Sequence, residues 1–553
     1  MRPWLSTTLL AAAICATPVP APGQPADKAS RVVFTVNNEG APRSLDPALM
    51  GGGRPEYRLY LALFEGLVVP DPETSLPRPG LAESWTASAD MKTCTFRLRP
   101  ARWSDGAGIK AQDVVDSWLR TLDPATQAVH LGDMLDAIPG ARDFHEGKAP
   151  RGKVGIRAVD ARTFEVSFTR PMPQAPFLLL EPCFGVVPLQ AVRAFGKDWA
   201  RPEHFVGNGP FVLAEWDSPE RIVVDRNPYY WNAAQVGLDR IAFMAIDGQD
   251  DAYDQYAAGA FDWSPGIDGR RYAEIKERRD YQCVPGSAVY YFNVNTGRKP
   301  FNDARVRKAL SMALDRTRVC EQVAGTGQMP TTDFVPPMPG FQLSTGSGYD
   351  PEGARRLLAE AGFPGGKGFP KFTVTYNAYV LHEQVAEWVA AQWKEVLGIQ
   401  ARLESLGWDI YRMRRLAHDF DICRAGWRAT LAEPTEFLRP FRRDGEDNAS
   451  RYASADVDAL LDRATGLPLG AARDQVLREA AQDVVDRDQA VIPLFFYPAQ
   501  DLIDLDRWEG WFPNTMGVHP WTSIRRRERG AALGARPPET PAGSPPGQAY
   551  VRT

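Results

Sequence analysis

The sequence predicts an α/β protein with several domains, and three observations point to it. The chain has 553 residues, enough for about three or four domains at roughly 150 residues each. Hydrophobic residues make up 44% and charged residues 24%, as in ordinary globular proteins. Segments with the two-residue period of strands alternate along the chain with segments of helical period. These features exclude a single small module, a disordered chain and a multi-span membrane protein.

The apolar pattern predicts individual elements in chain order. The helix near residue 355 has clear ends, because Asp350 is a good N-cap, Pro351 is tolerated in the first turn, and Gly362 can stop the helix. The last strand is apolar throughout, as expected for a buried strand. The predicted elements are strands at 94–98 and 164–168, helices at 306–314 and 354–361, a strand at 372–376, helices at 385–396 and 477–484, and a strand at 491–497.

The charge balance limits the possible partners. The chain has 64 Lys+Arg and 69 Asp+Glu, a net charge of -5, so it has no overall positive field for nucleic acid or anionic lipid. The 47 Gly, 47 Pro and 15 Trp suit a loop-rich protein that surrounds a ligand. Nucleic acid is therefore not an expected partner.

Both ends of the chain differ from its body. Residues 1–26 are typical of an export signal, with Arg2 followed by a short apolar run at 9–16. Cys15 follows the bulky Ile14, which favours a free periplasmic protein over a lipoprotein. Residues 525–553 carry six Arg, two Glu and five Pro, which predicts a disordered basic tail. This tail is either a solvated extension or an electrostatic contact.

No motif for a metal, a cofactor or covalent catalysis is present. His382 and Glu383 begin like a zinc motif, but Ala386 stands where the second histidine ligand is needed. There is no G-x-S-x-G and no G-K-[ST]. A secreted hydrolase of peptides or saccharides stays the alternative, because paired carboxylates leave no sequence signature. The mature chain has an odd number of cysteines and no C-x-x-C, which excludes a dense disulfide framework; they are Cys94, Cys183, Cys283, Cys320 and Cys423.

Ten short motifs run in a fixed order between residues 31 and 524. Each alone is weak, but the ordered series is specific. They are SLDP at 44–47, LFEGL at 63–67, LAESW at 81–85, WSDG at 103–106, AQDV at 111–114, NGPF at 208–211, RNPYYW at 226–231, FNDARVRKAL at 301–310, AGW at 425–427 and EPT at 433–435. In this series the chain resembles the periplasmic oligopeptide-binding proteins of ABC importers, extracellular solute-binding protein family 5.

The resemblance implies a three-lobed type II periplasmic binding protein of the large cluster C kind, with a hinged cleft. Lobe I would combine residues 31–64, 185–287 and 500–524. Lobe II would be 65–184, and lobe III would be 288–499. Closure around the ligand would remove it from water and present a distinct shape to the transporter.

The resemblance also implies which residues line the site. In such proteins the peptide backbone pairs like an added strand and its side chains enter hydrated pockets. The expected ring walls include Trp408, Trp427 and Tyr497, while His382, Arg415 and Arg424 would face the ligand C-terminus. For each of these positions a core or capping role is the structural alternative. The complete expected set is Tyr291, Asn293, His382, Trp408, Arg415, Arg424, Gly426, Trp427, Arg428, Thr430 and Tyr497.

The chain departs from the family where a peptide's free ammonium group would bind. Thr430 replaces an aspartate, Asn293 stands where an acid occurs, and Ala288 and Arg428 occupy positions that some members bridge with a disulfide. A buried ammonium group without an anion is costly. The hypothesis is a blocked, modified or more anionic ligand, such as an acylated or cell-wall-derived peptide. The alternative is that another acid, Glu56 or Glu433, provides the anchor.

The expected partners are a peptide or peptide-like small molecule and the permease subunits of an ABC transporter. Import and chemosensory signalling share the same closure, so the sequence leaves both open. We expect a monomer without cofactor.

Overall fold

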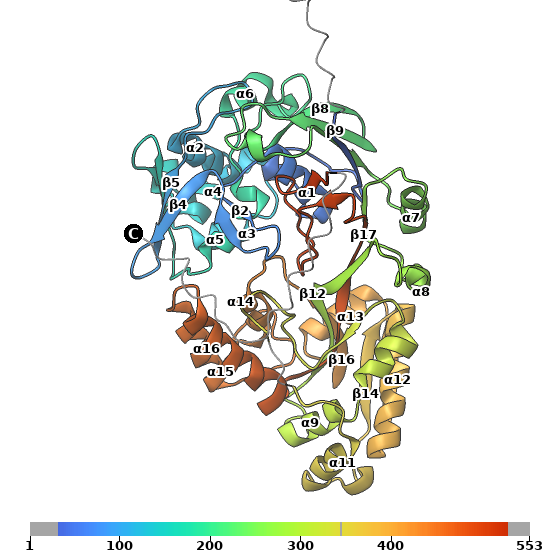
Figure 1. The fold of residues 1–553 in the computed structure, drawn as a ribbon. Coiled ribbons are helices and arrows are strands. Elements are labelled where there is room, and N and C mark those ends of the chain that lie inside the picture. Colours follow the sequence, from blue (N-terminus) through green and yellow to red (C-terminus); the bar gives the residue numbers. More distant parts are fainter. Residues whose placement is uncertain (1–30, 343–345, 529–553) are drawn as a thin grey trace, which may run out of the picture.

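The computed structural model describes residues 31–342 and 346–528. The names lobe I, lobe II and lobe III are kept for the residue ranges given above. Figure 1 shows the first two of these ranges side by side in the upper half and the third below them, joined by the long strands β12 and β17. The predicted export signal lies outside the described residues. Residues 525–528 of the predicted tail are described, and Arg525–Arg526 form strand β19 against β18 (Trp508–Glu509). The folded chain therefore continues past residue 525, and residues 529–553 lie outside the described part.

A large mixed sheet runs through lobes I and III. Its order is β15-β14-β16-β12-β17-β11-β1-β10-β9-β8, with β13 beside β17. The predicted strands at 372–376 and 491–497 are confirmed as β14 and the first half of β17. The strands are β1 Val33–Asn37, β8 Phe211–Ser218, β9 Arg221–Arg226, β10 Arg240–Met244, β11 Trp263–Pro265, β12 Tyr281–Val294, β13 Met329–Pro330, β14 Phe372–Asn377, β15 Ala401–Leu406, β16 Ile422–Arg428 and β17 Val491–Ile503.

Strands β12 and β17 connect the two halves of this sheet. The start of β12 pairs with the end of β17, which continues to β11 in lobe I. The second half of β12 pairs with β16 in lobe III. The register between β12 and β17 shifts between Pro285 and Val289, at the level where the lobes separate. Such an irregularity interrupts the ladder and lets the strands bend.

Lobe II has its own antiparallel sheet in the order β4-β5-β7-β6. The predicted strands at 94–98 and 164–168 are confirmed as β5 and β7. Trp118 of α2 is fully buried against Phe164, and its Nε1 donates to the carbonyl of Phe184 at 2.9 Å. The elements are β2 Val68–Pro70, β3 Pro77–Pro79, β4 Ala82–Ala87, β5 Thr93–Leu98, α2 Ala111–Leu122, α3 Gly132–Ala137, α4 Ala141–His145, β6 Ile156–Ala158, β7 Thr163–Ser167 and α5 Ala175–Leu178.

The helices predicted in lobe III are confirmed. In α11 the Asp350 carboxylate accepts the N–H of Gly353 at 2.8 Å, and Gly362 has a φ of +97° just beyond the helix. Two cores, one on each side of β12, hold the lobe together. The helices are α9 Ala304–Met312, α10 Arg316–Arg318, α11 Pro351–Glu360, α12 Val380–Leu397, α13 Trp408–Leu416, α14 Pro434–Leu438, α15 Ala455–Thr465 and α16 Ala471–Gln482.

Lobe I packs its helices and the C-terminal segment around β1. Its core joins residues from both ends of the chain: Phe34 of β1 meets Trp508 and Trp521 edge to face. Burial of aromatic side chains from distant segments stabilises this discontinuous lobe. The helices are α1 Arg54–Leu63, α6 Leu189–Phe195, α7 Gln249–Ala257 and α8 Tyr272–Ile275.

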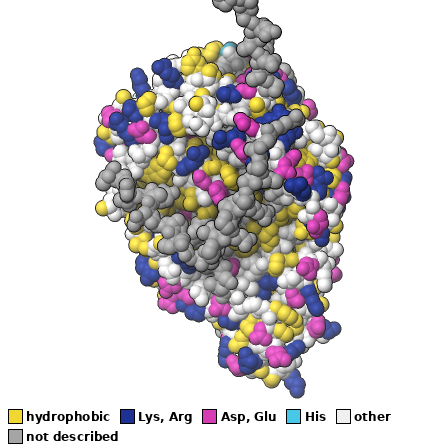
Figure 2. All heavy atoms as spheres, viewed as in Figure 1, with side chains coloured by type: hydrophobic (Ala, Val, Ile, Leu, Met, Phe, Trp, Pro, Cys, Tyr) yellow, Lys and Arg dark blue, Asp and Glu magenta, His cyan; other side chains and the backbone are white. Residues whose placement is uncertain are grey.

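Charge, cysteines and possible metal-binding groups can be described over the whole described chain. On the face in Figure 2, Lys and Arg side chains are interspersed with Asp and Glu side chains over both halves of the molecule. All five described cysteines are free. Residues 31–342 and 346–528 contain no group of three or more His, Cys, Asp or Glu side chains arranged for a metal ion. Within those residues, no helix has the length and apolarity needed to cross a bilayer.

Candidate functional site

A cleft of about 740 Å³ lies where the three lobes meet. Lobe I contributes the start of α1 and the segment at 516–519. Ser287, the last residue of lobe I before lobe III, also lines the cleft. Lobe II contributes α3 and the segments at 170–174 and 180–183, and lobe III contributes the loop from Arg428 to α14. A chamber walled by three lobes suits a ligand that is enclosed by lobe movement.

The lobe I wall is built by the first two turns of α1. Three glycines precede the helix, and Pro55 in its first turn suits the helix start. Arg54 and Arg58 are four residues apart and both line the cleft. Arg58 is 5% exposed; it pairs with Glu39 at 2.7 Å and lies over the ring of Trp263 at 5.0 Å. Its Nε and Nη1 have no hydrogen-bond partner.

The lobe III wall is the end of β16 and the loop after it. Arg428 and Thr430 are exposed in the cleft, and Ala288 lies directly opposite Arg428 in the ladder. The two positions that some family members bridge with a disulfide are therefore cross-strand neighbours here. Partial withdrawal from water and the positive charge of Arg54 lower the pKa of Arg428. Arg54 of lobe I and Arg428 of lobe III therefore line the same cleft, near enough for the charge of one to act on the other.

Neither acid proposed as a substitute anchor is free. Glu433 is 1% exposed and pairs with Arg473 at 2.6 Å, and its carboxylate also accepts the N–H of Thr435 at 2.9 Å as the N-cap of α14. Glu56 is buried and accepts the N–H of Arg43 at 3.3 Å. Both carboxylates are committed within the protein in this conformation.

Four other acids line the cleft between lobes II and III. They are Asp133 and Asp136 of α3, Glu181, and Glu436 of α14. Burial, with the negative charges of Asp133 and Glu436, raises the pKa of Glu181 to about 7. Burial is also the first cause of the raised pKa of Glu436. The lining is therefore positive at Arg54 and Arg428, where lobes I and III meet, whereas acids and arginines are mixed between lobes II and III.

A second polar group on β16 surrounds Arg424. Its Nη2 donates to the hydroxyl of Tyr497 at 2.8 Å, its guanidinium lies over Tyr290 at 4.7 Å, and its Nε has no partner. His382 is 6% exposed, and burial and Arg424 lower its pKa to about 3. The N-cap residue of α12 is Tyr379, no side chain makes a cap hydrogen bond there, and the Nδ1 of His382 has no partner. His382 therefore does not cap that helix. These residues lie outside the lining of the 740 Å³ cleft.

The remaining predicted site residues are placed in different surroundings. Tyr291 is 2% exposed and packs edge to face on Phe334, as a core residue does. Asn293 is buried opposite Cys423, and Arg415 lies close to Tyr291. Trp408 is 58% exposed at the start of α13. Trp427 is half-buried, and its Nε1 donates to the carbonyl of Glu436 at 2.9 Å.

Of the eleven predicted residues, Arg428 and Thr430 line the cleft. Arg424, His382 and Tyr497 form a separate group outside its lining. Gly426 is exposed between the two arginines of β16. Sequence reasoning missed the lobe I and lobe II walls. The run Gly51-Gly52-Gly53 before Arg54 is the one local signal that could have indicated a backbone approached by a ligand.

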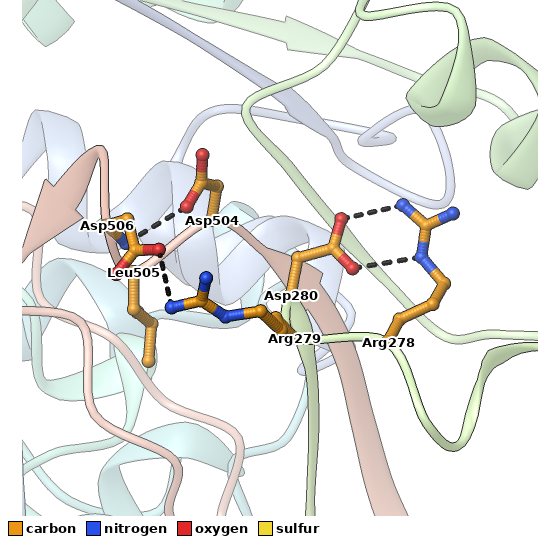
Figure 3. A pocket seen from close by; sticks show the side chains of 6 residues that line it. All are labelled: Arg278, Arg279, Asp280, Asp504, Leu505 and Asp506. Atoms are coloured by element: carbon orange, nitrogen blue, oxygen red, sulfur yellow. Dashed lines mark hydrogen bonds and ion pairs between the residues drawn. The ribbon is translucent and has the colours of Figure 1, made fainter.

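A smaller cavity of about 400 Å³ lies near the outer ends of β12 and β17. Figure 3 shows that its charged groups pair among themselves: Arg278 with Asp280 at 2.7 Å and Arg279 with Asp506 at 3.1 Å. These pairs are satisfied without a ligand. The cavity therefore has no part in the site described above.

Comparison with known proteins shows to which family this chain belongs. The sequence profile described as bacterial extracellular solute-binding proteins, family 5 Middle, matches residues 77–449. The chain belongs to extracellular solute-binding protein family 5. As a member of this family it has the type II binding-protein fold that the motif series indicated. The family and its neighbours are binding proteins, and nothing favours the hydrolase alternative.

Relatives match over nearly the full length of this family member. The periplasmic oligopeptide-binding protein OppA of Salmonella typhimurium is 35% identical over 532 residues, covering 94% of this chain and 96% of that protein. The unliganded open form of MppA, a periplasmic murein tripeptide binding protein, is 31% identical with a TM-score of 0.84, covering 90% of this chain and 98% of MppA. Haemophilus influenzae OppA in complex with the peptide RPPGFSPFR is 30% identical and covers 90% and 99%, with a TM-score of 0.61.

The TM-scores to the open form of MppA and to the peptide complex of OppA allow the overall arrangement of this structure to be compared with both. At similar identity and coverage, the described structure superposes better on the open form than on the peptide complex. In its overall arrangement this structure is therefore more similar to the unliganded open form of MppA than to the peptide complex of OppA.

Proposed function

We propose that this protein captures peptides or peptide-like ligands in the cleft between its lobes and delivers them unaltered to the permease of an ABC importer. The observation that carries this proposal is the cleft of about 740 Å³ walled by three lobes, in a chain whose relatives bind peptides. Closure around the ligand gives the transporter two shapes to distinguish.

The proposal also covers where the protein works and in which oligomeric state. Residues 1–26 act as an export signal, so the mature protein works in the periplasm, free of a lipid anchor and as a monomer. Its relatives are periplasmic proteins. The protein releases its ligand without chemical change.

The experiment that tests this function uses the protein purified from its own periplasm. Native mass spectrometry identifies molecules that remain bound. We expect peptides or peptide-like molecules, returned intact after incubation with the protein. Conversion of such a molecule to products would contradict the binding function, and gene neighbours encoding a permease and an ATPase would favour import over chemosensing.

We propose that Arg424, with Tyr497 and neutral His382, receives the carboxylate at one end of the ligand. The Arg424 Nε is unpaired, and Arg424 makes no ion pair with any acid in residues 31–342 and 346–528. A guanidinium matches a carboxylate in a forked geometry. Replacement of Arg424 by Gln should weaken binding of a peptide acid more than binding of its C-terminal amide, as measured by calorimetry.

At the other end, we propose that the ligand has no plain free ammonium group. Thr430 is neutral, and Glu433 is held by Arg473. Replacing Thr430 by Asp should raise the affinity for lysine-rich tripeptides with free amino ends, by about tenfold for a charge-assisted contact. Calorimetric titration measures this, with Thr430→Asn as the matched control. An unchanged affinity in Thr430→Asp would remove the charge argument.

A further inference from the structure

The two arginines of β16 and their surroundings carry an inference about the length and charge of the ligand. Arg424, Gly426 and Arg428 lie opposite Phe292, Tyr290 and Ala288 of β12. Because side chains alternate along a strand, Arg424 and Arg428 are on the same face of the sheet, four residues apart. At about 3.3 Å per residue this separates their backbones by about 13 Å, the span of about four extended residues.

The space between these arginines is open. Gly426 is exposed and lacks a side chain. A Cβ at this position would lie 3.4 Å from the nearest Nη atom of Arg424. An extended molecule can therefore lie along β16 with one end at each arginine.

The site at Arg428 has a counterpart on the opposite lobe. Arg54 lines the same cleft, and Gly517 packs beneath its guanidinium, with a Cβ at Gly517 placed 3.5 Å from Cζ. Neither Arg54 nor Arg428 makes an ion pair with an acid in the described part of the chain. Two like charges held near each other without an anion disfavour approach of the lobes.

A buried guanidinium adjoins this pair. Arg58, one turn after Arg54, keeps Nε and Nη1 without partners although it is 5% exposed. Two acids adjoin the arginines: Glu39, which pairs with Arg58, and buried Asp501, which accepts the Nε1–H of Trp263 at 2.9 Å. His519, whose pKa is lowered by burial and by Arg58 and Arg54, adds no negative charge. The N-terminus of α1 adds positive potential at the same place.

We propose that Arg54 and Arg428, supported by Arg58, form an anion-binding subsite between lobes I and III. Its ligand is an extended peptide-like molecule that carries a carboxylate, rather than a free ammonium group, at the end opposite Arg424. The carboxylate lies between the two guanidiniums and joins the lobes, so the open protein closes preferentially on ligands that are negative at both ends. This inference rests on the proposed function and specifies its ligand class.

The test uses one tripeptide library in three forms: with a free amino end, N-acetylated, and N-succinylated. Succinylation replaces the ammonium group by a carboxylate on a short spacer. The three forms are mixed in equal amounts with the purified protein, and native mass spectrometry measures which are retained. We expect at least about tenfold enrichment of the N-succinyl form over the free form, since one charge-assisted contact changes affinity by about that factor.

Arg→Gln variants test whether the proposed subsite causes the preference for the N-succinyl form. Arg54→Gln and Arg428→Gln should each reduce the enrichment to about threefold or less, because either guanidinium alone holds the carboxylate from one side only. Arg356→Gln is the matched control, because Arg356 is an exposed arginine of α11 that does not line the cleft. Its enrichment should equal that of the unchanged protein. Thermal unfolding of all three variants checks that the fold is intact.

The possible failures are distinguishable. Retention of free and N-succinyl peptides in equal amounts, or an unchanged preference in both Arg54→Gln and Arg428→Gln, would overturn the anion subsite and leave peptide capture standing. Retention of none of the three forms would overturn the proposed function together with this inference.

Discussion

At the scale of single residues, the environment of each charged side chain separates support of the fold from contact with a ligand. The Glu433–Arg473 pair has one acid and one base, both nearly inaccessible, and its carboxylate also caps α14. Arg54 and Arg428 have no acid partner and face the cleft. A buried pair is neutral as a unit, whereas unpaired guanidiniums at a cleft attract an anion.

Breaking the buried pair should destabilise the protein strongly. Replacing Arg473 by Met leaves the Glu433 carboxylate buried without its partner, at a cost of about 3 to 5 kcal/mol in the free energy of unfolding. Denaturant unfolding measures it. The exposed pair Arg463–Glu479 is the control, since Arg463→Met should cost less than about 1 kcal/mol. Equal effects of the two substitutions would contradict the role assigned to Arg473.

Glu181 should make stability depend on pH. Its pKa is about 7 in the folded protein, raised from an ordinary 4.5. The unfolded chain therefore loses this proton first, and stability falls as pH rises from about 4.5 through 7. Glu181→Gln should remove this loss. The free energy of unfolding of the variant, minus that of the unchanged protein, should therefore be about 1 kcal/mol larger at pH 8 than at pH 5. Unfolding at the two pH values measures the difference, and Glu383→Gln on an exposed turn of α12 should show none.

At the scale of elements, the strands β12 and β17 both hold lobe III and connect it to lobe I. The ladder between them is irregular from Pro285 to Val289, and Gly286 lies in this irregular segment. A Cβ at Gly286 would be 2.8 Å from the carbonyl oxygen of Tyr497. The close approach of two backbones requires glycine at this position.

Gly286→Ala should therefore displace β17 at the level of the lobe junction. We expect a loss of about 1 to 3 kcal/mol in the free energy of unfolding, as for other overpacked sites. We also expect an altered ligand affinity, although Gly286 does not line the cleft. Gly152→Ala is the control, because no atom lies within 4 Å of a Cβ there. A fully stable Gly286→Ala variant with unchanged affinity would show that this contact does not constrain the junction.

At the scale of the whole molecule, the structure is more similar to the unliganded open form of MppA than to the peptide complex of OppA. A cluster of Phe177, Leu431, Ala432 and Met516 already joins the three lobes at the edge of the cleft. In the cleft wall, Arg54 and Arg428 have no acid partner within the described residues, and an anionic ligand would provide one.

Ligand binding should make the molecule more compact and more stable. Small-angle X-ray scattering should show a smaller radius of gyration at saturating peptide than without it. At a free concentration 100 times the Kd, the free energy of unfolding should rise by about 2.7 kcal/mol. The control ligand is the free amino acid glycine, which is too short to contact two lobes. A gain in stability without a change in the radius of gyration would contradict closure.

The sequence by itself determined the family, the α/β class and the elements with clear local signals. The helix at 351–360 is an example, because its N-cap, its first-turn proline and the glycine after its end are all within fourteen residues of chain. Local signals of this kind act through the backbone of neighbouring residues and need no tertiary contact. The loss of the acid at Thr430 was equally visible, since it is a change of residue type within an ordered motif.

Only the tertiary structure decided which charges are available. Glu433 looked free in the sequence, but Arg473 from α16 neutralises it. Tyr291 was expected among the ligand-binding residues, but it packs into the core on Phe334. Arg54 drew no attention, yet lobe I places it in the same cleft as Arg428, 374 positions later in the chain. Burial and pairing depend on contacts between residues far apart in sequence, and such contacts leave no pattern in the neighbouring residues.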